Sequence, residues 1–408
     1  MLKELLHRKK FIYVVFAVGI GGSFQFGFHI SAINPPSEHI KKFINETWVE
    51  RHETPLQEYS LMLLWSFIVS IYPVGGLIGA QFAAVLTVTY GRKKSLLFNN
   101  IVAIVAALIM GFSKMAGSFE MIVVGRFLYG INSALQSLWG SGDFTEEVED
   151  MMAERAQTKG ESKKNLIQLV RDKTIRCQFL TGMAVSAGMQ LSGINIIYFY
   201  ASDVYHQLGI SKDNIPYVGI GSSSIEMLTS VMCGFIIERA GRRVLLWKGY
   251  CFMALWILFL IITLCLKERF SWIPYCSLVF IFAYILTFGM GPGSVTGVVP
   301  LEIFTQSNRS IAVVAANSLQ WFSLFGLGLV FPFVIDAFGQ FSFFLFFGNC
   351  SLASLFTFYV LPETKGKTLL QISEDFDKLR NAMKNGMCPY FSKRPIVSNQ
   401  TEVLSTRL

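Results

Sequence analysis

Charged residues are scarce in this chain of 408 residues, because Asp, Glu, Lys and Arg together make up only 15% of it. A soluble chain of average composition carries about 25% charged residues. Hydrophobic residues instead make up 52%, phenylalanine alone occurs 37 times, and the mean hydropathy is +0.48. The composition excludes an ordinary soluble domain and predicts an all-α integral membrane protein.

The sequence also lacks the residue patterns of disulfide frameworks, metal sites, phosphate-binding loops and catalytic sites. Its seven cysteines form no C-x-x-C pair and mostly lie in apolar runs, so neither a disulfide framework nor a metal site is predicted. The histidines are scattered, and neither a phosphate-binding glycine loop nor a catalytic constellation occurs. We therefore expect no enzyme, no metal and no cofactor.

A nucleic-acid partner is suggested only by the formal net charge of +8. Basic segments alternate with apolar spans instead of forming one stripe, so we expect a lipid bilayer as partner and no nucleic acid. If the amino end is inside, most Lys and Arg residues fall on the cytosolic side, as the positive-inside rule requires. Both termini are then predicted to be cytosolic.

Ten apolar stretches approach or exceed the roughly 20 residues that a membrane-spanning helix needs. The fourth is barely long enough and contains Arg126. Four spans precede a polar segment and six follow it. The predicted spans are residues 11–33, 61–86, 96–112, 119–139, 179–205, 217–237, 244–266, 272–299, 311–338 and 341–361.

The polar segment divides the chain into predicted domains. Asp143 and Glu146 lie where an N-cap and its reciprocal partner would, which favours short cytosolic helices over a disordered linker. Apolar residues also recur at helical spacing in the tail, from Leu369 to Leu379. The predicted domains are an N-terminal four-helix bundle (1–139), a cytosolic helical linker (140–175), a C-terminal six-helix bundle (176–362) and a cytosolic tail (363–408).

Two side-chain amides interrupt the fifth apolar span. Gln190 and Asn195 flank Ser192-Gly193, which weakens the helix. Hydrocarbon offers no water to amides, so they must face protein or a water-filled path. If the helix bends at Gly193, they flank one cavity and suit an uncharged ligand rich in hydroxyls. Interhelical hydrogen bonds between amides are the alternative.

The first span and the segment after it carry further polar candidates. Gln25 and His29 lie one turn apart on one face. His29 fits a packing role or a proton carrier. Asn45-Glu-Thr47 forms an N-glycosylation acceptor, and it is the only sequon that the predicted topology leaves usable.

Two basic turns indicate an internal repeat. Gly91-Arg92-Lys93 follows the second span, and Glu238-Arg239 with Gly241-Arg242-Arg243 follows the second span after the linker. Equivalent turns in two halves are typical of transporters built from duplicated bundles; two ordinary positive-inside loops are the alternative. By this symmetry the first half lacks a helix pair between Asn132 and Gly140.

Several motifs together resemble the sugar porters of the major facilitator superfamily, and within them the class II facilitative hexose transporters. The resemblance covers residues 1 to about 385 and breaks after Ser133, where about ninety family residues, including helices five and six, have no counterpart. It implies a major facilitator fold with a truncated N-terminal bundle. The motifs are residues 22–27, 64–66, 140–143 and 190–195, the two basic turns, Gly291-Pro292-Gly293, Glu302 with Arg309, and residues 362–366.

The resemblance also implies roles for individual residues. Gln190 and Asn195 match sugar-contacting amides of the family, and Glu226 and Gln320 replace asparagines of glucose-type members. These replacements favour fructose or a broader set of hexoses. His29 stands where proton-coupled members carry an aspartate, which favours a uniporter. The implied substrate contacts are Gln190, Asn195, Glu226, Gln320, Trp321, Gln25 and His29.

Gating residues follow from the same resemblance. The Gly291-Pro292 pair is expected to break its helix, since proline removes a donor and glycine loosens the backbone. A cytosolic charge network is expected to latch the two halves of the molecule. The implied gating and structural residues are Arg92, Glu238, Arg239, Arg242, Gly291, Pro292, Glu302, Arg309 and Glu363.

The resemblance implies a facilitative hexose uniporter that works by alternating access, with plasma membrane as the expected location. A second hypothesis is a shortened form that does not transport and acts as a partner or regulator of the full-length transporter. An error of gene prediction at the gap is a third reading. The sequence leaves the particular sugar and the oligomeric state open.

Overall fold

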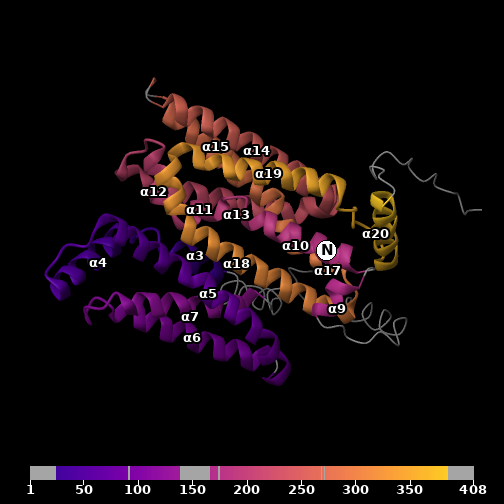
Figure 1. Ribbon diagram of the computed structural model, residues 1–408, viewed down its shortest axis with the longest axis horizontal. Helices are drawn as coiled ribbons and strands as arrows, with labels where there is room; N and C mark the ends of the chain where they lie inside the picture. Colours follow the sequence, from indigo (N-terminus) through magenta and orange to yellow (C-terminus); the bar gives the residue numbers. More distant parts are fainter. Residues whose placement is uncertain are drawn as a thin grey trace, which may run out of the picture.

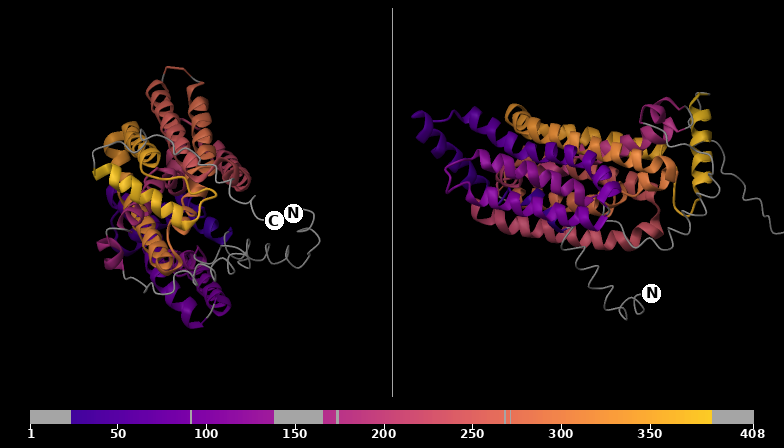
Figure 2. Two further views of the ribbon diagram at one scale, coloured as in Figure 1. Left: turned by 90° about the vertical axis from the view of Figure 1, so that its right-hand side faces the viewer. Right: turned by 90° about the horizontal axis from the view of Figure 1, so that it is seen from below.

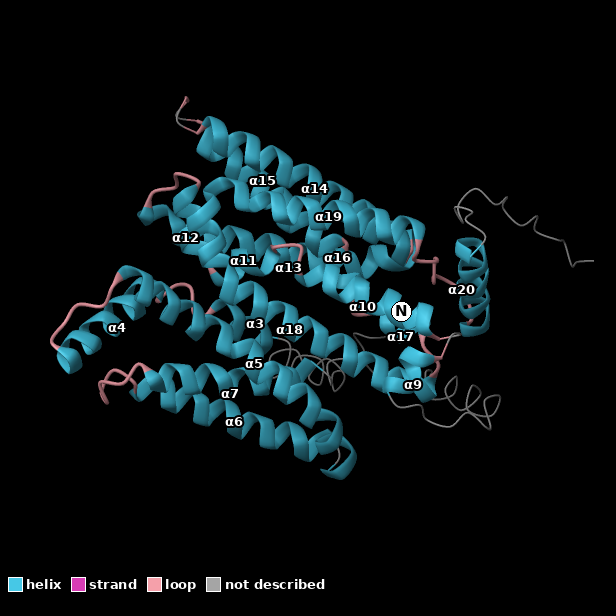
Figure 3. Ribbon diagram, in the orientation of Figure 1, coloured by secondary structure: helices cyan, strands magenta, loops and turns pink. Residues whose placement is uncertain are grey.

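Helices account for the regular structure of the part of the chain that the computed structural model describes, and no strand occurs there (Figure 3). That part comprises residues 24–90, 92–137, 166–172, 175–267, 269–270 and 272–384. The prediction of an all-α protein is confirmed for these residues. The predicted linker caps Asp143 and Glu146, and residues 11–23 of the first span, lie outside them.

The N-terminal part contains three long helices and two short ones. Its long helices α5 and α7 pack closely, and α6 packs on α7. Glycines allow this approach, because a Cβ at Gly130 would lie 2.0 Å from the Tyr72 carbonyl oxygen. The helices are α3 (Phe24–Ser31), α4 (Ser37–His52), α5 (Glu58–Tyr90), α6 (Arg92–Phe112) and α7 (Glu120–Ser137).

The C-terminal part contains the remaining apolar helices, with α14 packed between α15 and α19 (Figure 1). The amphipathic α20 lies across one end of the molecule, and buries Ile372 and Phe376 as the tail periodicity predicts (Figure 2). The helices are α9 (Leu166–Arg171), α10 (Arg176–Gln190), α11 (Ile194–Phe199), α12 (Ala201–Gln207), α13 (Ile215–Ala240), α14 (Arg242–Leu266), α15 (Ile273–Met290), α16 (Pro292–Val295), α17 (Val299–Ile303), α18 (Gln306–Phe338), α19 (Phe343–Tyr359) and α20 (Leu369–Lys384), with short 3-10 turns at Lys212–Asn214 and Gly339–Ser342.

Both predicted helix breaks are present. Gly193 separates α10 from α11 with a φ of +100°, a conformation that favours glycine. Gly291 separates α15 from α16, where Pro292 begins the new helix. Each break falls inside an apolar stretch that otherwise reads as one span.

The two parts meet along α5 and α18, which lie side by side (Figure 1). Tyr59 contacts Phe333 with ring centroids 5.6 Å apart, and Gln81 donates to Ser318 at 2.6 Å. The 22 residues between Tyr59 and Gln81 extend about 33 Å at a rise of 1.5 Å per residue. The contact therefore runs through a length comparable to the hydrocarbon core of a bilayer.

Six helical stretches of the described residues are long and apolar enough to cross a membrane. One of them, Ile311–Tyr359, contains both α18 and α19, and Leu97–Phe112 within α6 is shorter. Helix α7 is not among the six, because Glu120 and Arg126 lower its hydropathy. The count of ten spans stays a prediction.

Candidate substrate site and gates

The break between α10 and α11 brings the two predicted amides together. The Asn195 Nδ2 donates to the Gln190 Oε1 at 2.5 Å, and both side chains are buried. The Tyr284 hydroxyl donates to the Ser192 carbonyl oxygen at 2.8 Å and fixes the turn. The sequence folds this way locally because Gly193 accepts the positive φ and ends the helix between the two amides.

The amide pair can both donate and accept hydrogen bonds. Each amide has one donor group and one acceptor group, and the bond between them uses the acceptor of Gln190 and the donor of Asn195. The pair satisfies part of its hydrogen-bonding capacity in an apolar interior without any charge. Separation of the two side chains would free groups that match the hydroxyls of a sugar.

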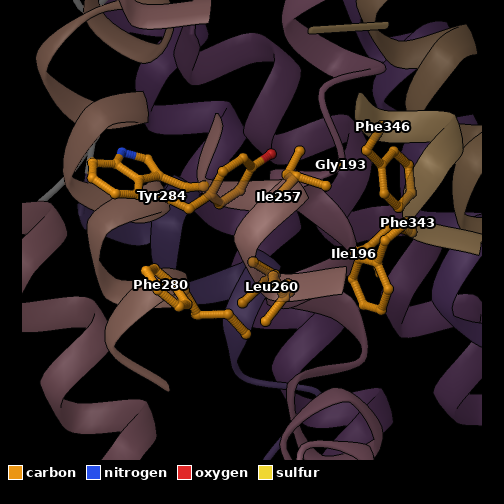
Figure 4. A pocket seen from close by; sticks show the side chains of 11 residues that line it. Gly193, Ile196, Ile257, Leu260, Phe280, Tyr284, Phe343 and Phe346 are labelled. Atoms are coloured by element: carbon orange, nitrogen blue, oxygen red, sulfur yellow. The ribbon is translucent and has the colours of Figure 1, made fainter. Parts of the chain in front are cut away.

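Two cavities lie near the broken helix, and neither is lined by the amide pair. A cavity of about 20 Å³ lies beside Gly193 and is bounded by Tyr284 and Phe346. Figure 4 shows the Phe343 and Phe346 rings on one side of it and Tyr284 and Phe280 on another. A cavity of about 200 Å³ lies between α10, α14 and α19. The amide pair is thus enclosed in this conformation.

The predicted substrate contacts Glu226, Gln320 and Trp321 do not converge on the amide pair. Glu226 is half-buried on α13 and interacts with Tyr198 of α11. Trp321 is buried against α5, with its ring centroid 5.8 Å from that of Tyr72. A Cβ at Gly76 would lie 2.4 Å from the Trp321 ring. Trp321 therefore packs between the two parts, and Gln320 beside it is half-buried.

Gln25 and His29 both lie on α3. Gln25 is half-buried, whereas His29 is buried and stacks on Tyr129 with ring centroids 3.9 Å apart. The geometry supports the packing role of His29.

The sequence analysis did not predict the role of Arg126, whose Nη1 donates to the His29 carbonyl oxygen at 2.5 Å. The only indication in the sequence was a charged residue inside an apolar run.

The predicted charge network is present only in part. The Arg242 guanidinium pairs with Glu302 at 2.8 Å, and the Arg242 backbone N–H donates to the Glu363 carboxylate at 2.8 Å. The Glu302 carboxylate also accepts from the Thr364 hydroxyl. These contacts join α14, α17 and the segment before α20, all of which belong to the C-terminal part.

The expected latch between the two halves is therefore not seen at these residues. Arg309 donates to the Phe304 carbonyl oxygen at 3.3 Å within its own part, and Arg239 contributes a carbonyl oxygen to Lys365 at 2.7 Å. Arg92 begins α6 and Glu238 lies near the end of α13, but their side chains are outside the described structure.

The break before α16 is tightly packed. A Cβ at Gly291 would lie 2.8 Å from the Leu245 carbonyl oxygen. A Cβ at Gly249 would lie 2.7 Å from the Pro292 Cδ. The backbone at this break therefore packs directly on α14, so a bend between α15 and α16 must shift their packing on α14.

The sequon residue Asn45 lies within α4. Its Oδ1 accepts from the Leu56 backbone N–H at 3.4 Å, and Thr47 is buried. The polar segment after the first span is thus a folded helix, which the sequence analysis did not predict.

The family model described as "Sugar (and other) transporter" matches residues 14–139 and 132–376. The chain belongs to this sugar transporter family. Curated relatives agree: the human solute carrier family 2, facilitated glucose transporter member 11 is 35% identical over an alignment of 471 positions, covering 93% of this chain and 95% of the relative. Member 5 from Equus caballus is 31% identical and covers 88% of this chain and 90% of that relative.

Solved structures show the same fold. The crystal structure of a D-xylose-proton symporter matches with a TM-score of 0.68 at 20% identity, covering 88% of this chain and 100% of the other. The family model and the curated relatives confirm the predicted resemblance to the sugar porters, and the structural match confirms the major facilitator fold. Members of this family transport sugars and are not enzymes, as the sequence predicts.

Proposed function

We propose that this chain is a facilitative uniporter that moves hexoses, such as fructose or glucose, down their gradient by alternating access. The observation that carries the proposal is the buried amide pair at the Gly193 break. Its relatives are named as facilitated glucose transporters. His29 packs against an aromatic ring at the position that holds an aspartate in proton-coupled members, which supports uniport.

In this mechanism Gln190 and Asn195 exchange their mutual bond for bonds to sugar hydroxyls. The enclosed pair corresponds to a state without sugar, and opening of the α10–α11 break admits the substrate. The Gly291-Pro292 break allows the neighbouring helix to bend as the cavity opens and closes. From the family resemblance we propose five further contacts, which do not converge on the amide pair in the enclosed state: Glu226, Gln320, Trp321, Gln25 and His29.

The proposed architecture is a bundle of four spans, a linker, and a bundle of six. Two observations support the loss of a helix pair from the first bundle. The alignment of 471 positions uses 93% of this chain's 408 residues, so roughly 90 positions have no residue here. The family model also matches in two pieces that overlap at residues 132–139, where the predicted gap lies.

We infer that helix α13 lost packing partners with the missing helix pair. Tyr217, Met227 and Phe235 on this helix are 74%, 70% and 68% exposed. Only a narrow ridge that includes Ser222, Thr229 and Cys233 is buried. We further propose that the chain lies in the plasma membrane with both termini in the cytosol, a topology that leaves Asn45 outside as a glycosylation site.

Uptake by the purified full chain in proteoliposomes tests the function. Saturable uptake of labelled fructose or glucose is expected, and Gln190→Ala should reduce it about ten-fold, because loss of a buried polar contact to a substrate costs about 1.4 kcal/mol or more. Gln340→Ala, at a helix end away from the break, serves as the matched control. Absence of uptake from correctly inserted protein would contradict the proposal and would leave the transport-inactive form as the alternative.

A further inference from the structure

Arg126 is an ionised side chain enclosed in the N-terminal part. It is 2% exposed, and among the described residues it is the only Asp, Glu, Lys or Arg side chain that is fully buried. It lies on α7 six residues after Glu120, which is about 9 Å along the helix. Arginine keeps its charge in proteins, so this charge requires compensation.

The contacts of Arg126 compensate the charge only in part. The Nη1 donates to the His29 carbonyl oxygen, and the guanidinium carbon lies 4.6 Å from the centre of the Tyr72 ring. The Nε and Nη2 atoms are buried and have no hydrogen-bond partner among the described residues. A cation–π contact is worth about 2 kcal/mol when desolvated, which is less than a buried charge demands.

No carboxylate of the surrounding elements supplies the missing charge. Arg126 forms no ion pair with any described residue. The sequence holds no Asp or Glu at positions 11–33 or 59–112, which covers α3, α6 and all of α5 after Glu58. The nearby titratable side chain is instead the imidazole of His29, which is itself buried.

Other buried groups around Arg126 also have no partner with hydrogen-bond geometry. They include the His29 Nε2, the Tyr72 hydroxyl and the Ser133 hydroxyl. Each of these groups can donate to an acceptor, the histidine in its Nε2-protonated form. The Tyr72 and Ser133 hydroxyls interact with each other and can also accept, but none of these groups carries the negative charge that would balance the guanidinium.

We propose that Arg126 forms the centre of a binding site for a small monovalent anion, enclosed by α3, α5 and α7. The anion is either a halide or the carboxylate of a small solute, since both accept from the free Nε and Nη2. The Tyr72 ring against the guanidinium and the stacked pair of His29 and Tyr129 enclose this region, so the proposed ligand is a small anion and not a phosphate ester or a lipid headgroup. Anion binding would stabilise this part of the fold without contacting the amide pair at Gly193.

Thermal unfolding of the purified full chain in lipid nanodiscs tests the site. At constant ionic strength, replacing sodium gluconate by sodium chloride is expected to raise the Tm saturably by about 2 °C or more, because a ligand that binds only the folded state stabilises it. Arg126→Gln should abolish the difference. Arg269→Gln, an exposed arginine in a loop, should keep it.

A second variant decides the question even if Arg126→Gln does not fold. His29→Asp places a carboxylate beside the guanidinium, so its Tm should become the same in chloride and in gluconate. Sodium acetate and sodium lactate separate the two sources: a rise in Tm with these salts, exceeding the rise with chloride, assigns the site to a solute carboxylate. An unchanged wild-type Tm in chloride, acetate and lactate would overturn the proposal, as would a salt response that persists in His29→Asp. None of these readouts depends on sugar uptake.

Discussion

The two parts of the molecule differ in the charge of the polar groups that they fully bury. In the C-terminal part the fully buried polar side chains are uncharged among the described residues. Some of them pair, as Asn195 with Gln190 and the Tyr200 hydroxyl with the Gly328 carbonyl oxygen at 2.7 Å. Others, such as the Tyr250 hydroxyl, have no hydrogen-bond partner in the described part of the chain. In the N-terminal part, buried atoms of His29, Tyr72 and Arg126 have no hydrogen-bond partner among the described residues. Unpaired buried atoms thus occur in both parts, and what sets the N-terminal part apart is that it encloses the charge of Arg126.

Glycines also pack differently at the contact between α5 and α7 and at the Gly193 break. In the N-terminal part, glycines on α5 and α7 bring backbone against backbone, as at Gly75 and Gly130. In the C-terminal part, the glycine at the Gly193 break faces the ring of Phe346 instead, although Gly291 lies against the Leu245 backbone. Backbone cannot move aside as a ring can, so the contact between α5 and α7 should tolerate added atoms less well than the Gly193 break does.

The largest expected effect is that of Gly130→Ala. The new Cβ would lie 2.0 Å from the Tyr72 carbonyl oxygen and 2.8 Å from the Gly76 nitrogen, so α5 and α7 must separate. We expect a loss of about 3 kcal/mol in the free energy of unfolding, measured by denaturant unfolding in detergent. Gly111→Ala on α6, where nothing lies within 4 Å of the new atom, should change it by less than about 0.5 kcal/mol. Equal losses for Gly130→Ala and Gly111→Ala would show that the close backbone contact between α5 and α7 does not limit stability.

A smaller loss is expected for Gly193→Ala. The substitution places a Cβ 2.5 Å from the Phe346 ring and requires a non-glycine residue at a φ of +100°. The strain and the overlap should cost about 2 kcal/mol, because the ring can yield. Gly326→Ala on α18 has open space and serves as control. A wild-type unfolding midpoint for Gly193→Ala would show that the break does not need its glycine.

The smallest effect is expected at the ion pair that links the two parts on the α4 side. Lys41 of α4 lies 3.4 Å from Asp203 of α12, and the two side chains are 24% and 46% exposed. Exposed pairs contribute about 0.5 kcal/mol and are screened by salt. Lys41→Ala should therefore lower stability by that amount at low salt and by less at 1 M salt. A loss above about 2 kcal/mol that salt does not reduce would mean that the pair holds the two parts together.

Local features of the fold followed from the sequence. The break at Gly193 was predictable because Ser192-Gly193 weakens a helix between two amides. The break at Gly291 was predictable from the proline that follows it, and α20 from its apolar spacing. Each of these rests on residues within one turn or two of the chain.

Long-range contacts did not follow from the sequence. The packing of Trp321 on Gly76 joins positions far apart in the chain, and no local pattern encodes it. The enclosure of Arg126 was visible only as a charge in an apolar run, because its neighbours lie on α3 and α5. The charge network at Arg242 was expected to join the two halves, but its partners proved to come from its own part.

A double-mutant cycle on sugar affinity tests the central claim most directly. Fructose and glucose binding to the purified chain would be measured for wild type, Gln190→Ala, Asn195→Ala and the double variant. Because each amide is proposed to bind sugar hydroxyls, each single substitution should weaken binding about ten-fold or more, and the double variant should bind no more tightly than the weaker single variant. Wild-type affinity in both single variants would contradict a sugar site built on this pair.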